Sequence, residues 1–198
     1  LQQLGISLRD IAKNKKVFYF LLAFFFYIDG VYTIIDMSTA YGSALGLGST
    51  DMLLALLVTQ FVAFPFAILF GKLSQKGMSE KLIMIAIAAY TGIAIFAYFM
   101  SASWQFWVLA IFVGMFQGGI QALSRSYFAK IIPAERSGEF FGFYDICGKG
   151  ASVIGTTLMG LVSQMTGSVN NGVGVIAVFF VIGLILFVVS TRQEAANN

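Results

Sequence analysis

Two residues of opposite charge, Asp29 and Lys149, lie inside long apolar stretches of the sequence. Ionisable side chains are costly at membrane depth, where they commonly bind a solute, carry a proton or pair with one another. Counted from the start of each apolar stretch, Asp29 lies roughly 18 Å deep and Lys149 roughly 14 Å deep. We therefore predict that both side chains face one polar cavity and that either has a substrate or proton role.

Other polar residues near them leave a structural alternative open. Asp145 and Lys149 are spaced i,i+4, so they can form a salt bridge on one helix face and have no role in transport. Tyr32 places a hydroxyl group near the carboxylates and is a further candidate for the pathway. Asp36 lies at the outer end of the same stretch as Asp29, where we expect it to be solvated.

Amide side chains mark a second polar face. Gln117 and Gln121 are spaced i,i+4 in another apolar stretch and share one helix face. Polar groups in lipid must find partners, so this face points into the protein or into a cavity. Gly114 and Gly118 form a small-xxx-small pair, which favours close helix packing. The same spacing recurs at Gly138 and Gly142, and at Ala151 and Gly155.

The residue types that are missing exclude several kinds of site. The sequence has no histidine, which excludes histidine-based catalytic triads and histidine metal sites. Its single cysteine, Cys147, cannot form an internal disulfide. Because no nucleophile and base are placed together, we expect no enzyme and no cofactor. The net charge of +3 gives no reason to expect a nucleic-acid partner.

The elements that must position these residues are membrane-spanning helices. The chain is 59% hydrophobic and 11% charged, whereas soluble domains are about 45–50% apolar and about 25% charged. Six stretches are long enough to span a bilayer, namely Val17–Ile35, Met52–Phe70, Leu82–Met100, Trp104–Ser124, Phe140–Met165 and Val173–Ser190. They are apolar on every side, which favours helices over β-barrel strands. We therefore predict an all-α, polytopic membrane protein.

Basic residues predict how these helices are oriented. Apart from Lys149, the lysines and arginines lie before the first stretch, in every second connection and after the last stretch. Basic loops remain on the cytoplasmic side, so we expect a multi-pass protein of the cell membrane with both termini cytoplasmic. Residues 1–16 are predicted to be a cytoplasmic linker or an interfacial helix, 17–191 the transmembrane domain and 192–198 a cytoplasmic tail.

Two motifs resemble known transporters. Gly71–Gly77 (GKLSQKG) resembles the loop between the second and third helices in each half of a major facilitator superfamily transporter, with Gln75 in place of the usual aspartate. Gly118–Ser126 (GGIQALSRS), followed by Ile132-Pro133 and by Phe140–Tyr144 (FFGFY), resembles the vacuole-effluxer-like permeases linked to autophagy and their bacterial relatives.

The resemblance implies that the chain is the C-terminal half of a secondary active transporter. Its partners would be the N-terminal six-helix half, the lipid bilayer and a small-molecule solute that moves by alternating access, with possible proton coupling through Asp29. The resemblance implies these residues of the cavity: Asp29, Gln60, Gln117, Gln121, Asp145 and Lys149. It implies a cytoplasmic gate around Lys72, Lys76, Arg125 and Arg136.

Two alternatives remain. The chain could be a half-size carrier that works as a homodimer, or a membrane scaffold or receptor that transports nothing. A scaffold predicts that the polar residues satisfy one another and enclose no open cavity. A polar cavity open on one side of the six-helix domain would favour transport.

Overall fold

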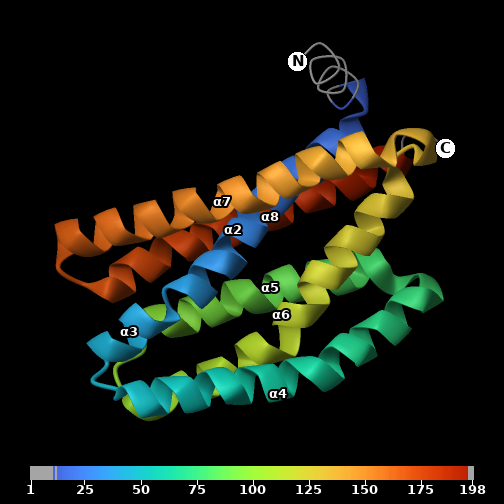
Figure 1. Cartoon of the computed structure of the whole chain (residues 1–198). Helices are drawn as coiled ribbons and strands as arrows, with labels where there is room; N and C mark the ends of the chain where they lie inside the picture. The colour runs from blue at the N-terminus through green and yellow to red at the C-terminus, as the bar shows by residue number, and fades with distance from the viewer. Residues whose placement is uncertain (1–10, 12, 196–198) are drawn as a thin grey trace.

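A computed structural model describes residues 11 and 13–195 as six long α-helices and one short one (Figure 1). The helices are α2 (Lys15–Asp36), α3 (Ser38–Ala44), α4 (Ser49–Leu73), α5 (Ser79–Tyr98), α6 (Ser103–Ile131), α7 (Ser137–Thr166) and α8 (Val169–Ala195). No strand occurs in this described part of the chain. The all-α class and the six apolar helices are confirmed, whereas most of the predicted segment 1–16 lies outside the described residues.

α4 and α5 belong to one run of 50 residues, Ser49–Tyr98, that is interrupted at Gly77. The π-helical turn η1 (Ser74–Met78) joins the two helices, and Gly77 within it has a φ of +78°. This left-handed conformation is unfavourable for residues that carry a Cβ atom. The hydroxyl groups of Ser74 and Ser79 lie 2.8 Å apart and connect the two helix ends. The chain reverses direction here, so the run makes two membrane spans (Figure 1).

Replacing Gly77 with alanine is expected to destabilise the protein by about 1–2 kcal/mol, because alanine disfavours the left-handed conformation of this turn. Gly71 in α4 offers a matched control, since a Cβ atom there would meet open space and alanine is the better helix former. We expect Gly71→Ala to keep or raise the melting temperature. Thermal unfolding measures both variants, and equal melting temperatures would contradict the role assigned to Gly77.

Most helix ends lie beyond the predicted apolar stretches, most of all the end of α6, and one short helix was not predicted. α6 continues to Ile131 instead of ending at Ser124, because a helix can extend beyond its apolar stretch while its backbone remains hydrogen-bonded. It ends where Ile132 becomes extended, with φ −101° and ψ 154°, directly before Pro133. The short helix α3 occupies much of the connection between the first two spans, where no helix was predicted.

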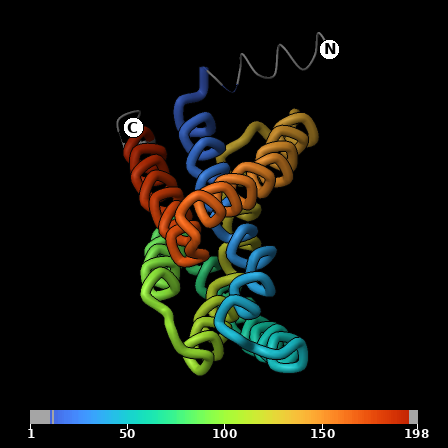
Figure 2. The backbone as a smooth tube through the Cα atoms, turned by 90° about the vertical axis from the view of Figure 1, so that its left-hand side faces the viewer, coloured from blue at the N-terminus to red at the C-terminus, as the bar shows by residue number. Residues whose placement is uncertain are grey.

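The long helices pack in two groups. α2, α7 and α8 contact one another, α6 packs against α4 and α5, and the α5–α8 and α2–α6 contacts join the groups (Figure 1). Figure 2 shows the same division from the side, with α4 at the edge of the second group. Because α4 contacts mainly α6, it leaves large apolar side chains such as Leu53, Phe61 and Phe64 exposed.

Aromatic side chains fill the junction of α2, α6 and α8. The ring of Phe20 in α2 lies 5.3 Å from Tyr127 and 5.5 Å from Phe128, both in α6, and 6.1 Å from Phe187 in α8. Aromatic pairs at these separations contribute beyond the burial of their surface. This cluster fixes the C-terminal part of α6, near Gln121 and Arg125.

Small residues allow close helix contacts at two of the predicted pairs. A Cβ atom on Gly114 would lie 2.6 Å from the carbonyl oxygen of Thr59, so α4 and α6 touch through this glycine. Gly155 makes the corresponding contact between α7 and α2. The packing prediction was wrong for Gly138 and Gly142, which would have open space around a Cβ atom. They lie nearer the start of α7, before its glycine contact with α2 begins at Gly148.

The beginning of α2 and the end of α8 lie side by side. The Ser190 hydroxyl donates a hydrogen bond to the carbonyl oxygen of Lys16 at 2.8 Å. Six spans therefore bring both ends of the described chain to one side of the bundle (Figure 1). This is the arrangement that the basic-residue pattern requires, while the cytoplasmic location of that side remains a prediction.

Candidate functional site

A cavity of about 400 Å³ lies between α2, α6 and α7. α2 contributes the faces of Phe24, Ile28 and Tyr32, which recur at helical spacing. The remaining lining residues come from α6 and α7: Gly118, Gln121, Ala122, Arg125, Tyr144, Asp145, Gly148 and Lys149. Four of the predicted pathway residues, namely Tyr32, Gln121, Asp145 and Lys149, are thus brought together on one wall. Arg125, predicted at the gate, lines the same cavity.

The ion pair in this cavity joins two helices. Nη1 of Arg125 in α6 lies 3.4 Å from Oδ1 of Asp145 in α7, and both side chains are about half exposed. The guanidinium group also lies 5.0 Å from the ring centre of Phe141 and 6.0 Å from that of Tyr144. These contacts place the positive charge over aromatic rings, where it is attracted to their π-faces.

The local pair between Asp145 and Lys149, which their spacing left open as a structural alternative, does not form. Asp145 instead pairs with Arg125, because α6 brings a guanidinium group to the cavity face of α7. Lys149 is exposed on the cavity wall and forms no ion pair within the described residues.

Asp29 lies at a different place, in the contact between α2 and α7. It is fully buried, and its Oδ1 accepts hydrogen bonds from the backbone N–H of Gly155 at 3.0 Å and from the Thr33 hydroxyl at 3.3 Å. Its Oδ2 has no hydrogen-bond partner in the part of the chain that the structure describes. Only one of the two carboxyl oxygens of Asp29 therefore has hydrogen-bond partners among the described residues.

The prediction that Asp29 and Lys149 face one cavity was therefore wrong. The depth of a residue along a helix does not determine the direction in which its side chain points. Ile28 lines the cavity, and Asp29 is the next residue, about 100° further around the helix. That rotation directs its carboxyl group toward Gly155 on α7.

A glycine makes this contact possible. A Cβ atom on Gly155 would overlap with Oδ1 of Asp29 and with the Thr33 hydroxyl. The absence of a side chain thus allows the carboxyl group to reach the backbone of α7. On the neighbouring residue of α2, a Cβ atom on Gly30 would lie 2.6 Å from the ring of Phe180 in α8. Two consecutive residues of α2 are therefore fixed by two different helices.

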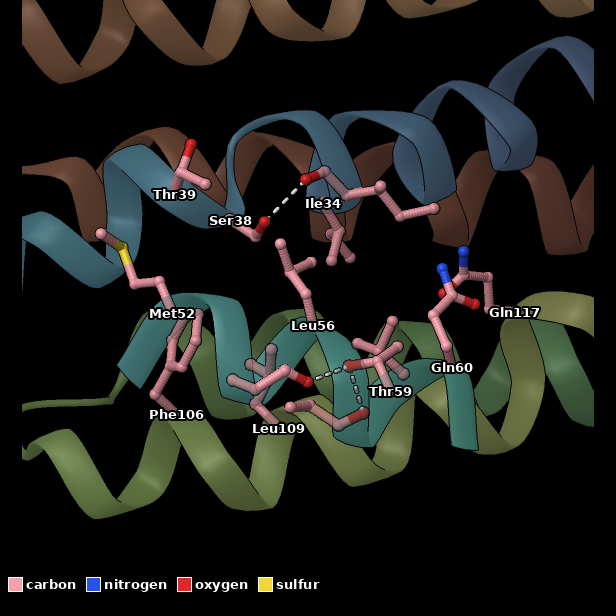
Figure 3. Close-up of a pocket in the computed structure, with 14 residues that line it drawn as sticks. Ile34, Ser38, Thr39, Met52, Leu56, Thr59, Gln60, Phe106, Leu109 and Gln117 are labelled. Atoms are coloured by element: carbon pink, nitrogen blue, oxygen red, sulfur yellow. Dashed lines mark hydrogen bonds between the residues drawn. The ribbon is translucent and has the colours of Figure 1, made fainter. Parts of the chain in front are cut away.

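A second, smaller cavity of about 60 Å³ lies between the end of α2, α3, α4 and α6. Gln60 and Gln117 line one end of it (Figure 3). The Thr59 hydroxyl on its floor donates to the carbonyl oxygens of Ala55 at 2.9 Å and Ala110 at 3.2 Å. Gln117 and Gln121 thus line different cavities along the same face of α6.

The other predicted gate residues lie away from the larger cavity. Lys72 and Lys76 are exposed at the end of α4 and in η1. Arg136 pairs with Glu139 at 2.8 Å near the start of α7. Among the four, Arg125 lines the larger cavity.

The aromatic wall of the larger cavity was missed as part of the site. The rings of Phe24 and Tyr144 stack with their centres 4.0 Å apart and an interplanar angle of 20°. Both residues line the cavity. The motif Phe140–Tyr144 points to this region, but it does not predict the contact of Tyr144 with Phe24 in α2.

The whole chain, residues 1–198, matches the family described as "Vacuole effluxer Atg22 like". It is 48% identical to the MFS-type transporter YxiO of Bacillus subtilis (strain 168) over 196 residues, which are 99% of this chain and 46% of that protein. It is 27% identical to autophagy-related protein 22 of Saccharomyces cerevisiae (strain ATCC 204508 / S288c) over 172 residues, which are 79% of this chain and 32% of that protein. The chain thus spans less than half the length of these relatives.

Proposed function

The chain belongs to the Atg22-like vacuole effluxer family, and we propose that it forms the C-terminal half of a secondary active transporter of the major facilitator superfamily. The observation that carries this proposal is the polar cavity between α2, α6 and α7, with Lys149 on its wall. In a scaffold, we would expect the charge of such a lysine to pair with another residue of the protein. The match to 46% of the bacterial relative supports a second half of similar size.

The partner in this proposal is an N-terminal six-helix half of the same polypeptide. The exposed apolar face of α4, with Leu53, Phe61 and Phe64, offers surface for such a partner. The larger cavity would then be closed by the facing half.

A homodimer of two copies of this chain is the competing arrangement. Blotting the native membrane distinguishes the homodimer from the fused transporter. A polypeptide of about twice 21.5 kDa supports the fused half, and one of 21.5 kDa contradicts it.

The mechanism would be alternating access, in which the two halves rock around the central cavity. The Arg125–Asp145 pair links α6 to α7 on the wall, so it would resist movement of one helix relative to the other. Asp29 would carry the coupled proton. Its Oδ2 has no described partner, and a buried carboxylate without a cation is costly unless it is neutralised.

Reconstitution of the native polypeptide into liposomes tests the proposal. Uptake of a labelled panel of amino acids, organic acids, amines and sugars would be measured against empty liposomes, with and without a pH gradient. We expect protein-dependent movement of at least one solute. A correctly folded preparation that moves none of them would contradict a transport function and favour the scaffold.

A further inference from the structure

The larger cavity has an unbalanced charge. Three charged side chains line it: Arg125, Asp145 and Lys149. Asp145 is already within 3.4 Å of the Arg125 guanidinium group. The ammonium group of Lys149 therefore carries the one charge on this wall that no described carboxylate pairs with. This half of the cavity therefore contributes one net positive charge, which favours a solute that carries a single negative charge.

The side chains near Lys149 indicate which groups the uncharged part of such a solute would contact. Five residues before Lys149 on the same helix, Tyr144 stacks on Phe24, and Ile28 continues the apolar wall along α2. Gln121 and Tyr32 supply neutral hydrogen-bonding groups on the same cavity surface. An anionic head at Lys149 and a short apolar body against Phe24 and Ile28 would use both kinds of surface.

We infer that the cavity selects a small organic monoanion, with its carboxylate held by Lys149, an inference that rests on the proposed transport function. A cation would face Arg125 and Lys149 and would have to displace the guanidinium group from Asp145. A zwitterion would satisfy Lys149 but would bring an ammonium group for which this wall offers no unpaired carboxylate among the described residues. In this half of the cavity, Lys149 thus favours a negatively charged solute.

Four compounds of equal carbon number test this selection: butyrate, 4-aminobutyrate, butylammonium and butyramide. Each is added to the purified native polypeptide, and the melting temperature is followed against compound concentration, because a ligand that binds the folded state raises it. We expect butyrate to raise the melting temperature by on the order of 2 °C at about ten times its dissociation constant. The other three compounds should raise it less at the same concentration.

Substitutions at one residue separate charge from packing. Lys149→Gln is expected to weaken the apparent affinity for butyrate by about tenfold or more, because a charge-assisted contact is lost. Lys149→Arg keeps the charge and should retain most of the affinity. Lys81→Gln removes a lysine that lies on α5, outside the cavity lining, and should leave butyrate binding unchanged.

The inference is overturned if butyrate does not raise the melting temperature, if 4-aminobutyrate or butylammonium raises it more, or if Lys149→Gln binds butyrate as the native protein does. The liposome panel distinguishes these results from a failure of the proposed function. Protein-dependent movement of amines, sugars or zwitterions would uphold transport while overturning selection for a monoanion.

Discussion

Replacing Gly155 with alanine is expected to lower the melting temperature by roughly 5 °C and to abolish gradient-driven uptake. The added Cβ atom would overlap with Oδ1 of Asp29 and the hydroxyl group of Thr33. α7 would have to move away from α2, and the 3.0 Å hydrogen bond from Gly155 to Asp29 would be lost. Overpacking costs about 1–3 kcal/mol, and the hydrogen bond contributes a further ~1 kcal/mol. Thermal unfolding and liposome uptake measure the two effects.

Gly160 provides the matched control on the same helix. A Cβ atom on Gly160 would meet no atom within 4 Å, and alanine has the higher helix propensity by about 1 kcal/mol. Gly160→Ala should therefore keep or raise the melting temperature and preserve uptake. If Gly155→Ala behaved in the same way, the contact between α2 and α7 would not have the importance assigned to it.

Replacing Asp29 with asparagine is expected to reduce pH-gradient-driven uptake at least about tenfold while solute exchange without a gradient continues. Asparagine has nearly the same shape, and its amide oxygen can accept the hydrogen bond from Gly155 that Oδ1 now accepts. The asparagine side chain cannot release or bind the coupled proton. The charged groups that line the cavity, Arg125, Asp145 and Lys149, are unchanged by the substitution. Uptake would be compared with and without an imposed pH difference, and exchange by counterflow.

Asp36 serves as the control for this substitution. It ends α2 and is exposed, so Asp36→Asn should alter neither the rate nor the pH dependence. Should Asp29→Asn retain both the native rate and the native response to the gradient, proton coupling through Asp29 would be ruled out.

Much of the fold follows from the sequence because the bilayer constrains it strongly. Each span requires a long apolar stretch, and the basic residues alternate between connections. Two further features have local causes. A positive φ angle at Gly77 interrupts the run of α4 and α5, and the missing side chain of Gly114 allows the contact of α6 with α4. These features depend on a few neighbouring residues, so a single sequence is sufficient to indicate them.

The site was harder to predict because it depends on the rotation and pairing of helices. Ile28 and Asp29 are adjacent, yet one lines the cavity and the other contacts Gly155. Sequence spacing favoured Lys149 as the partner of Asp145, whereas the tertiary structure places Arg125 there. Neither outcome can be read from the spacing within one helix, since each is determined by the packing of a second helix.

Thiol accessibility at Ala122 tests most directly whether this wall lines the pathway of a transporter. Ala122 lies on the cavity surface of α6. Cys147, the single cysteine of this chain, is replaced with serine, as is any cysteine of the proposed N-terminal half. Ala122→Cys in that background would be treated with a membrane-impermeant methanethiosulfonate in right-side-out and in inside-out vesicles. Ile185→Cys, on the exposed apolar surface of α8, supplies the control for a lipid-facing position.

Alternating access predicts that Ala122→Cys reacts from both sides of the membrane, while Ile185→Cys reacts from neither. Reaction from both sides requires that water reaches the cavity in two different states of the protein. If Ala122→Cys were as unreactive as Ile185→Cys in both kinds of vesicle, the cavity would not be a water-filled pathway, and the proposed transport function would be contradicted.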